Sequence, residues 1–234
     1  MITIKDIKIA DCGYYINLDH RVDRKENIEN QFVQNNISGI IRHQANKSSD
    51  SGPQNCKYSH YELYKKFLQD ADNQILLVLE DDCLFLPPLI DNIQEISNNI
   101  YSNDFDIFWL GCRNRRTPRL IKNKCYKVQS VSHAQSYLIN RKLCQYLIDN
   151  FPESGHNGLA IDELLCLVVY GYDVSMDPNK YGFYQMDNPI DNLATFFNGL
   201  CYERALTTQY QSFSDLWQSY SNYEDYITSS YPMV

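Results

Sequence analysis

The segment ILLVLEDDCLF, residues 75–85, joins an unbroken apolar run to three consecutive acids. An apolar run of this length is typical of a strand that is covered on both faces of its sheet. Three carboxylates at its end are unfavourable, because burial and mutual repulsion both disfavour their charged forms unless a cation lies beside them. The segment therefore predicts a buried strand with a cation at its carboxyl end.

Strand and helix patterns alternate on both sides of this segment. Further strands are expected at residues 14–18, 39–43, 105–111 and 173–177, and one near 136–140. Helices are expected at residues 23–36, 55–71, 87–100, 141–151 and 161–171. This order predicts an α/β fold with a mostly parallel central sheet and helices on both faces, in which ligands bind outside the carboxyl ends of the strands.

The size of the chain, 234 residues, fits one α/β domain with a small appendage. We expect the domain to cover residues 1–195, and the aromatic-rich residues 196–234 to form a helical extension packed on it. The net charge of −8 and the pI of about 5.1 argue against a nucleic-acid partner, because an acidic surface repels phosphate backbones.

The eight cysteines contain no CxxC pair, which argues against a zinc site of the usual spacing. Reduced thiols are the favoured interpretation, and a secreted disulfide protein is the alternative. The N-terminus alternates polar and apolar residues without a basic region followed by an apolar one, and no apolar run reaches the roughly 20 residues needed to cross a bilayer. These features predict a cytoplasmic protein with no transmembrane segment.

The acids themselves suggest a metal site. Glu80 and Asp82 are separated by one residue, so in an extended chain their side chains point to the same face. Carboxylate oxygens suit Mg²⁺ and Mn²⁺, and a metal held this way can neutralise a diphosphate leaving group. The alternatives are a solvated acidic turn with Asp82 capping a helix, and a phosphatase of the haloacid-dehalogenase type. The phosphatase is disfavoured, because Glu80 stands where that family has its nucleophilic Asp and Leu84 where it has Thr or Val.

Several segments, in order, resemble glycosyltransferase family 25, which contains lipooligosaccharide and procollagen galactosyltransferases. They are YYINLDHRVDRKENI, CKYSHYELYKKF, LLVLEDDCLF, FDIFWLG, SYLINRKLCQYL, IDELL and DVSMDPNKYGFYQ, which together span about residues 12–190. The chain departs from the family pattern at Asn55, where the family has Gly, in the basic stretch 113–119, and after residue 196.

The resemblance implies a GT-A fold, a UDP-sugar donor carrying galactose or glucose, a Mn²⁺ (or Mg²⁺) ion at a DxD-like motif, and a glycan or protein hydroxyl as acceptor, as in lipopolysaccharide or other glycan biosynthesis. The departures leave open a catalytically inactive GT-A-fold binding or scaffold protein. A substitution of Asp82 would separate an enzyme, which loses turnover, from a scaffold, which keeps its partner.

The resemblance also suggests roles for individual residues. Asp82 is the first candidate metal ligand, Glu80 the second, and Gln185 a late ligand, although a buried hydrogen-bonding Gln is equally consistent. Asp81 is expected to face away and to hold a helix N-terminus or a basic neighbour.

Donor contacts are expected after the first strand and at the start of the second helix. The candidates are Asn17 for the base, Asp19, one of Arg21 and Arg24 for phosphate, and Ser59 and His60 for the sugar or diphosphate. Glu80, which could touch the donor's ribose, and Asp81 are also candidate donor-binding residues. The alternatives are surface pairs between these arginines and nearby acids, and a core histidine.

The catalytic base is expected at the start of the helix at 161–171. Asp162 is the first choice and Glu163 the second, because a carboxylate there could deprotonate an acceptor hydroxyl. The alternative is a pair of ordinary acids that interact favourably with the helix dipole.

Overall fold

The computed structural model describes residues 1–45, 52–151, 159–170, 197–210, 212–214, 219–221 and 227–231. Its centre is an eight-stranded sheet. In spatial order the strands are β5 (Ile41–Gln44), β3 (Cys12–Asn17), β6 (Ile75–Glu80), β11 (Val131–Asn140), β8 (Ile107–Asn114), β12 (Gly199–Tyr202), β10 (Cys125–Lys127) and β9 (Arg119–Lys122). Strands β11 and β10 run opposite to the others, so the predicted mostly parallel α/β sheet is confirmed in its strand directions.

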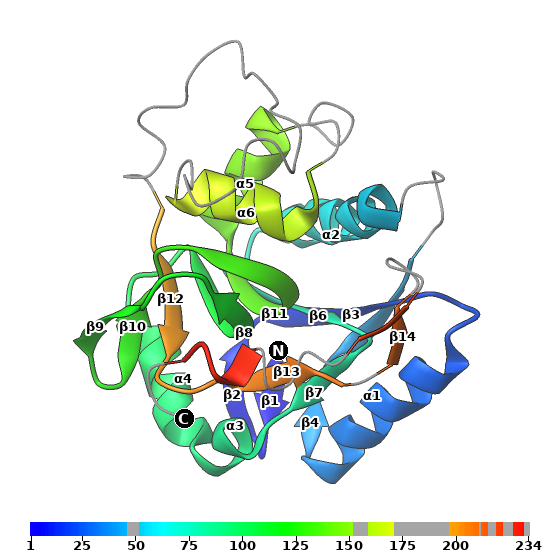
Figure 1. Ribbon diagram of the computed structural model, residues 1–234, viewed down its shortest axis with the longest axis horizontal. Helices are drawn as coiled ribbons and strands as arrows, with labels where there is room; N and C mark the ends of the chain where they lie inside the picture. The colour runs from blue at the N-terminus through cyan, green and yellow to red at the C-terminus, as the bar shows by residue number, and fades with distance from the viewer. Residues whose placement is uncertain are drawn as a thin grey trace.

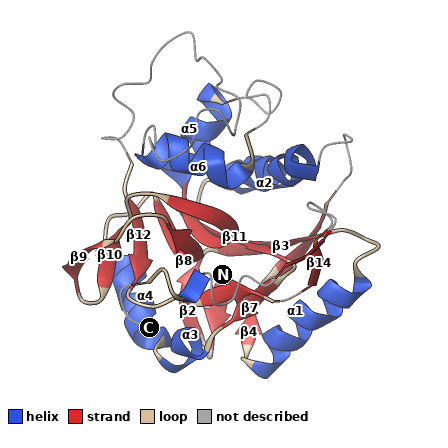
Figure 2. Cartoon of the chain, viewed as in Figure 1, coloured by secondary structure: helices blue, strands red, loops and turns tan. Residues whose placement is uncertain are grey.

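Helices cover both faces of this sheet, as Figures 1 and 2 show. One face carries α2 (Gly52–Gln69), α5 (Arg141–Asn150) and α6 (Ile161–Tyr170). The other face carries α1 (Val22–Gln34), α3 (Pro87–Asp91), α4 (Ile93–Ser102) and a small sheet of β1 (Ile2–Ile4), β2 (Ile7–Ala10) and β4 (Ile37–Ser38). The predicted placement of helices on both faces is therefore confirmed.

The apolar run of β6 is explained by these two layers. Leu76 and Val78 point into the core beneath α2, α5 and α6, whereas Leu77 and Leu79 point into the core on the opposite face. Successive side chains of a strand alternate between faces, so a strand buried on both sides is apolar at every position. The position of the acids follows, because β6 ends at Glu80.

The C-terminal part of the described chain differs from the helix that we expected after residue 196. Residues 199–202 form β12 within the central sheet, and the short strands β13 (Thr207–Gln209), β14 (Ser212–Ser214) and β15 (Ser219–Ser221) follow. Alternating polar and aromatic residues suit strands, and β12 gains a parallel partner in β8. The division of the chain at residue 195 stays a prediction.

Other elements differ in detail from the prediction. Strands β1 and β2 precede the strand that we expected to be the first, and the helix expected at 87–100 is divided at Asn92 into α3 and α4. The stretch 113–119 contains the end of β8 and the first residue of β9. The strand expected at 173–177 lies outside the described residues.

Strand β13 returns the chain to the end of β6. It pairs with β7 (Cys83–Phe85), which places Gln209 opposite Cys83, directly after the acids. Strand β13 also lies close to β8. Gly111 of β8 permits this, since a side chain there would collide with the backbone carbonyl of Thr207 in β13. The chain thereby brings residues that are far apart in sequence to one site.

All eight cysteines lie among the described residues, and none of them is in a disulfide. Within the described parts of the chain, no helix combines the length and the apolar character needed to cross a membrane.

Candidate active site

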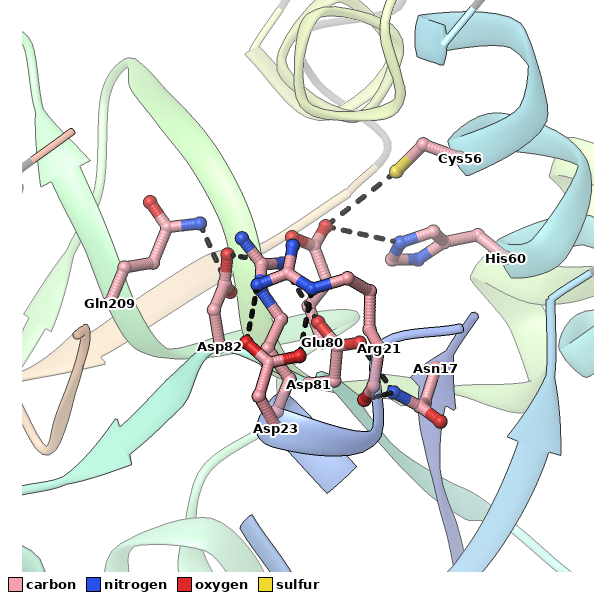
Figure 3. Close-up of polar contacts among 10 residues, drawn as sticks. Asn17, Arg21, Asp23, Cys56, His60, Glu80, Asp81, Asp82 and Gln209 are labelled. Carbon is pink, nitrogen blue, oxygen red and sulfur yellow. Dashed lines mark hydrogen bonds and ion pairs between the residues drawn. The ribbon is translucent and has the colours of Figure 1, made fainter. Parts of the chain in front are cut away.

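The candidate site lies where β3 and β6 end side by side. The two strands are parallel neighbours, with Ile16 opposite Glu80, so Asn17 and the three acids emerge at the same edge of the sheet. Figure 3 shows their side chains converging with residues from α1, α2 and the C-terminal strand β13. This is the carboxyl edge at which ligands are expected to bind in a sheet of this kind.

Asp81 is the most enclosed of the three acids. It accepts a hydrogen bond of 2.7 Å from Asn17 Nδ2 and one of 2.9 Å from Arg24 Nη1. Burial raises the pKa of Asp81, and the Arg24 guanidinium opposes that rise. Asp81 therefore fixes the strand end and holds a basic neighbour, the second of the two roles that we expected for it.

Asp82 lies beside the same guanidinium, with its Oδ2 3.1 Å from Arg24 Nη1, and its Oδ1 accepts a 3.3 Å hydrogen bond from Gln209 Nε2. Its side chain is 13% exposed. Burial raises the pKa of Asp82 to about 7; the Arg24 guanidinium opposes this rise, and the charges of Glu80 and Asp81 add to it. The charged form of Asp82 is therefore disfavoured, which leaves a deficit of positive charge at this carboxylate.

That deficit is what a divalent metal ion would correct, and the Asp82 carboxylate supplies the hard oxygen donors that Mn²⁺ and Mg²⁺ prefer. The residues present therefore fit such an ion in charge and in donor chemistry. Arg24 contacts one of the two Asp82 oxygens, so the ion would share that carboxylate with the guanidinium.

Glu80 has different partners from Asp82, although we expected the two to serve one ion. Its Oε1 lies 3.4 Å from His60 Nε2 and accepts a 3.7 Å hydrogen bond from the Cys56 thiol. Burial acts to raise its pKa, but the His60 contact, together with Arg24 and Cys56, lowers it overall. The strand ends at Glu80, so the period-two alternation that we assumed does not extend through Asp81 to Asp82.

The two residues that we expected on the second helix have different surroundings. Ser59 donates its hydroxyl to the carbonyl of Asn55 within α2, and it is buried. His60 is fully buried, and its Nδ1 lies 2.6 Å from the hydroxyl of Tyr137. The structure brings His60, but not Ser59, into hydrogen-bonding range of an acid of the cluster.

The candidate donor-binding residues after β3, Asn17 and Asp19, also differ in their surroundings. The amide of Asn17 is fully used, because its Nδ2 donates to Asp81 and the Arg21 carbonyl while its Oδ1 accepts from Arg42. Asp19 is 61% exposed and pairs with Arg42 at 2.6 Å.

The two arginines that we expected to compete for phosphate also differ. Arg21 forms a two-point ion pair with Asp23, and Arg24 joins the acids instead. Arg24 contacts the acids that follow β6, through Asp81 and Asp82.

Asp162 and Glu163 open α6, and both accept backbone N–H groups. Asp162 Oδ2 accepts from His133 N at 2.9 Å, and Glu163 Oε2 accepts from Ala160 N at 2.9 Å, as a residue that caps a helix does. Burial raises the pKa of Glu163. After burial and Glu80, Asp162 also raises the pKa of the Cys56 thiol, so it lies within electrostatic range of the cluster.

Gln185, the expected late metal ligand, lies outside the described residues. The residues that sequence reasoning missed come from β11 and β13. Gln209 contacts Asp82, whereas His133 and Gln135 lie in an irregular part of β11, between Ser132 and Ser136, where His133 has a positive φ of 69°. No local motif marks any of them, because their positions depend on strand pairing.

The model of "Glycosyltransferase family 25 (LPS biosynthesis protein)" matches residues 41–165, which is more than half of the chain. A protein of Acanthamoeba polyphaga mimivirus that is provisionally named a glycosyltransferase is 30% identical over 105 residues. The alignment covers 36% of this chain and 32% of the viral protein, so the matched part spans about a third of that relative's length.

Solved structures with a similar arrangement share little sequence with the chain. A glycosyltransferase involved in the glycosylation of the major capsid of PBCV-1 has a TM-score of 0.41 and 10% identity, covering 82% of this chain and 92% of that one. The inositol-1-phosphate CTP transferase from T. maritima has a TM-score of 0.38 and 10% identity, covering 80% of this chain and 64% of that one.

Proposed function

Because the chain belongs to glycosyltransferase family 25, we propose that it transfers a hexose, galactose or glucose, from a UDP-sugar to a glycan or hydroxyl acceptor with the help of a divalent metal ion. The observation that supports this most strongly is the excess of negative charge at the end of β6. Burial, with the charges of Glu80 and Asp81, raises the pKa of Asp82 to about 7, and a divalent metal ion beside the carboxylate would favour its charged form.

Asp82 would hold the ion, and Mn²⁺ or Mg²⁺ bound there would neutralise the diphosphate of the leaving UDP. Arg24 fixes the Asp82 carboxylate at the end of the sheet. Gln209 donates to the other oxygen of Asp82, so it would orient the carboxylate that receives the ion. Gln185 remains a proposed additional ligand.

The donor would lie over the ends of β3 and β6. Asn17 holds Asp81 and the Arg21 carbonyl, so it shapes this surface rather than offering a free amide to uracil. Arg21 would contact the phosphate, because Arg24 is held by Asp81 and Asp82, whereas the Asp23 partner of Arg21 is 60% exposed. The exposed carboxylate of Asp19, which accepts from Arg42 and Gln44, would also accept from a ribose hydroxyl.

The acceptor would be activated by Asp162. Glu163 caps α6 by accepting from the Ala160 N–H. The charge of Asp162 contributes to the raised pKa of the Cys56 thiol, so Asp162 lies nearer the acids that follow β6. A carboxylate that removes the acceptor proton as the sugar is transferred contributes about 10²–10⁴-fold to the rate.

The test is an assay of UDP-hexose hydrolysis and transfer with purified protein, with and without Mn²⁺. We expect metal-dependent release of UDP, and a loss of at least about a hundredfold in Asp82→Asn, a magnitude typical of removing one electrostatic contact to the transition state. Asp72→Asn is the matched control, since Asp72 is an exposed acid in the turn before β6. Equal activity in both variants, or none in the wild type, would count against the proposal.

A second candidate is a GT-A-fold scaffold without catalysis. It is favoured by the Arg24 guanidinium, which already contacts both Asp81 and Asp82 and so partly replaces a metal ion. A scaffold would show no effect of Mn²⁺ on its thermal stability or on UDP binding, and Asp82→Asn would leave its partner binding unchanged.

A further inference from the structure

Two residues of α2 face Glu80 from one side of the helix. Cys56 and His60 are four positions apart, so their side chains lie on one face, one turn apart. The Cys56 sulfur lies 3.7 Å and His60 Nε2 lies 3.4 Å from the same oxygen, Glu80 Oε1. The three ligand atoms lie within 4.8 Å of one another, and Figure 3 shows them converging.

These separations match the edges of a tetrahedral zinc site. A zinc ion about 2.0–2.1 Å from nitrogen and oxygen and about 2.3 Å from sulfur would separate the nitrogen and oxygen by about 3.3 Å, and the sulfur and oxygen by about 3.6 Å. The observed separations, 3.4 and 3.7 Å, are already at these values. The separation of the Cys56 sulfur and the His60 nitrogen is at most 4.8 Å.

The imidazole of His60 is oriented as a metal ligand is. Its Nδ1 lies 2.6 Å from the Tyr137 hydroxyl, which in turn lies 2.6 Å from the Tyr64 hydroxyl. His60 is fully buried, and its Nε2 makes no hydrogen bond of good geometry within the described residues, although Glu80 lies close to it. A ring held through one nitrogen, with the other directed at a carboxylate and a thiol, is the arrangement that partners of metal-bound histidines impose.

We propose that Cys56, His60 and Glu80 bind a thiophilic divalent cation of the zinc class. Thiolate and imidazole donors suit Zn²⁺, whereas Mn²⁺ and Mg²⁺ favour oxygen donors such as those of Asp82. Binding releases the Cys56 thiol proton to solvent. The Glu80 side chain is 23% exposed, so water can reach the carboxylate of the site. The site is separate from the proposed nucleotide function, although Glu80 borders both.

The experiment uses the wild-type chain, freed of metal with a chelator and titrated with Co²⁺ as a spectroscopic probe for Zn²⁺. We expect a thiolate-to-cobalt charge-transfer band at one equivalent, which Zn²⁺ abolishes by displacement. Zn²⁺, but not Mn²⁺, should also slow alkylation of Cys56, measured by mass spectrometry. Cys12 is the internal control, because it is the other half-buried cysteine and lies outside the cluster.

Variants give a second readout. Cys56→Ser should remove the cobalt band, Cys12→Ser should keep it, and Tyr137→Phe should weaken Zn²⁺ binding by about 10-fold or more through the loss of the His60 partner. A missing cobalt band, or equal Cys56 alkylation with and without Zn²⁺, would overturn the proposal. Neither result bears on Mn²⁺-dependent UDP binding, so a failure here is distinguishable from a failure of the proposed function.

Discussion

Two sides of one strand end differ in how their acids are neutralised. On the side of α1, Asp81 and Asp82 share the guanidinium of Arg24. On the side of α2, Glu80 meets a histidine and a thiol. The pKa of Asp82 is raised to about 7, whereas that of Glu80 is lowered, although the two residues are only two positions apart.

Three consecutive acids are therefore not one chemical unit. The pKa of each acid depends on the residues of the helix beside it, because burial and the nearest partner set a carboxylate's pKa. The Asp82 side offers hard oxygen donors, and the charged form of Asp82 is disfavoured. The Glu80 side adds softer nitrogen and sulfur donors, and the charged form of Glu80 is favoured. The following predictions test this division.

The largest effect on stability is expected at Arg24. Arg24→Met leaves Asp81 and Asp82 buried without their close cation, which should destabilise the fold by about 3–5 kcal/mol at pH 8. The loss should be smaller at pH 5, where the carboxyl groups are more readily protonated. Chemical denaturation of the chelator-treated protein measures both values.

Arg21→Met is the control for this change. The Arg21 side chain is 10% exposed but its partner Asp23 is 60% exposed, so Arg21→Met leaves that carboxylate in solvent and should destabilise the fold less than Arg24→Met does. If the two arginine variants lose equal stability, the contrast between buried and exposed partner carboxylates is wrong.

The second prediction concerns pH. The pKa of Asp82 is raised from 3.8 to about 7, so the folded chain binds a proton there more tightly than the unfolded chain does. This contribution to stability is fully present below about pH 4 and is lost as the pH rises through 7. The stability of the wild type relative to Asp82→Asn should therefore fall by up to about 4 kcal/mol between pH 4 and pH 8.

Denaturation of both proteins across this pH range, with a chelator present, gives the measurement. Added Mn²⁺ should recover stability in the wild type above pH 7 but not in Asp82→Asn, because metal binding needs the deprotonated carboxylate. A difference between the two proteins that does not change with pH would show that Asp82 is not electrostatically strained.

The third prediction concerns Gln135, which is fully buried and makes no amide hydrogen bond within the described residues. Removing an unsatisfied buried amide with Gln135→Met should stabilise the fold by about 1–3 kcal/mol. We expect transfer activity to fall in the same variant, because a retained unsatisfied group points to a role in ligand binding. A less stable variant with full activity would contradict both expectations.

The smallest effect is expected at Glu163. Glu163→Ala removes the acceptor of the Ala160 N–H at the start of α6 and should destabilise the fold by about 0.5–2 kcal/mol. The rate of transfer should stay near that of the wild type, whereas Asp162→Asn should lose it. A Glu163 variant that folds well and transfers no sugar would reverse the roles of the two acids.

Much of the fold could be predicted from local patterns. The strand at 75–80 and the helices α1 and α2 were expected within a few residues of their observed ends, because periodicity and apolar runs report burial directly. Strands β1 and β2 were missed, because they are short. The tail was expected to be helical, although its strands depend on partners distant in sequence.

The site was less predictable than the fold. The acids and His60 were marked by the sequence, but the division of Glu80 from Asp82 depends on where β6 ends and which helices lie beside it. Gln209 reaches Asp82 only through the pairing of β13 with β7, and no local signal precedes that pairing. The sequence therefore marks the acids and His60, which lie in recognisable motifs, but not Gln209, whose position depends on strand pairing.

Calorimetric titration of UDP into the purified chain, with and without Mn²⁺, measures whether Asp82 holds a metal ion that binds the nucleotide. We expect UDP to bind the wild type only when Mn²⁺ is present, and we expect Asp82→Asn to lose this metal-dependent binding while Asp72→Asn retains it. If UDP does not bind the wild type with Mn²⁺, or binds the wild type and Asp82→Asn equally, Asp82 is not the ligand of a nucleotide-binding metal ion.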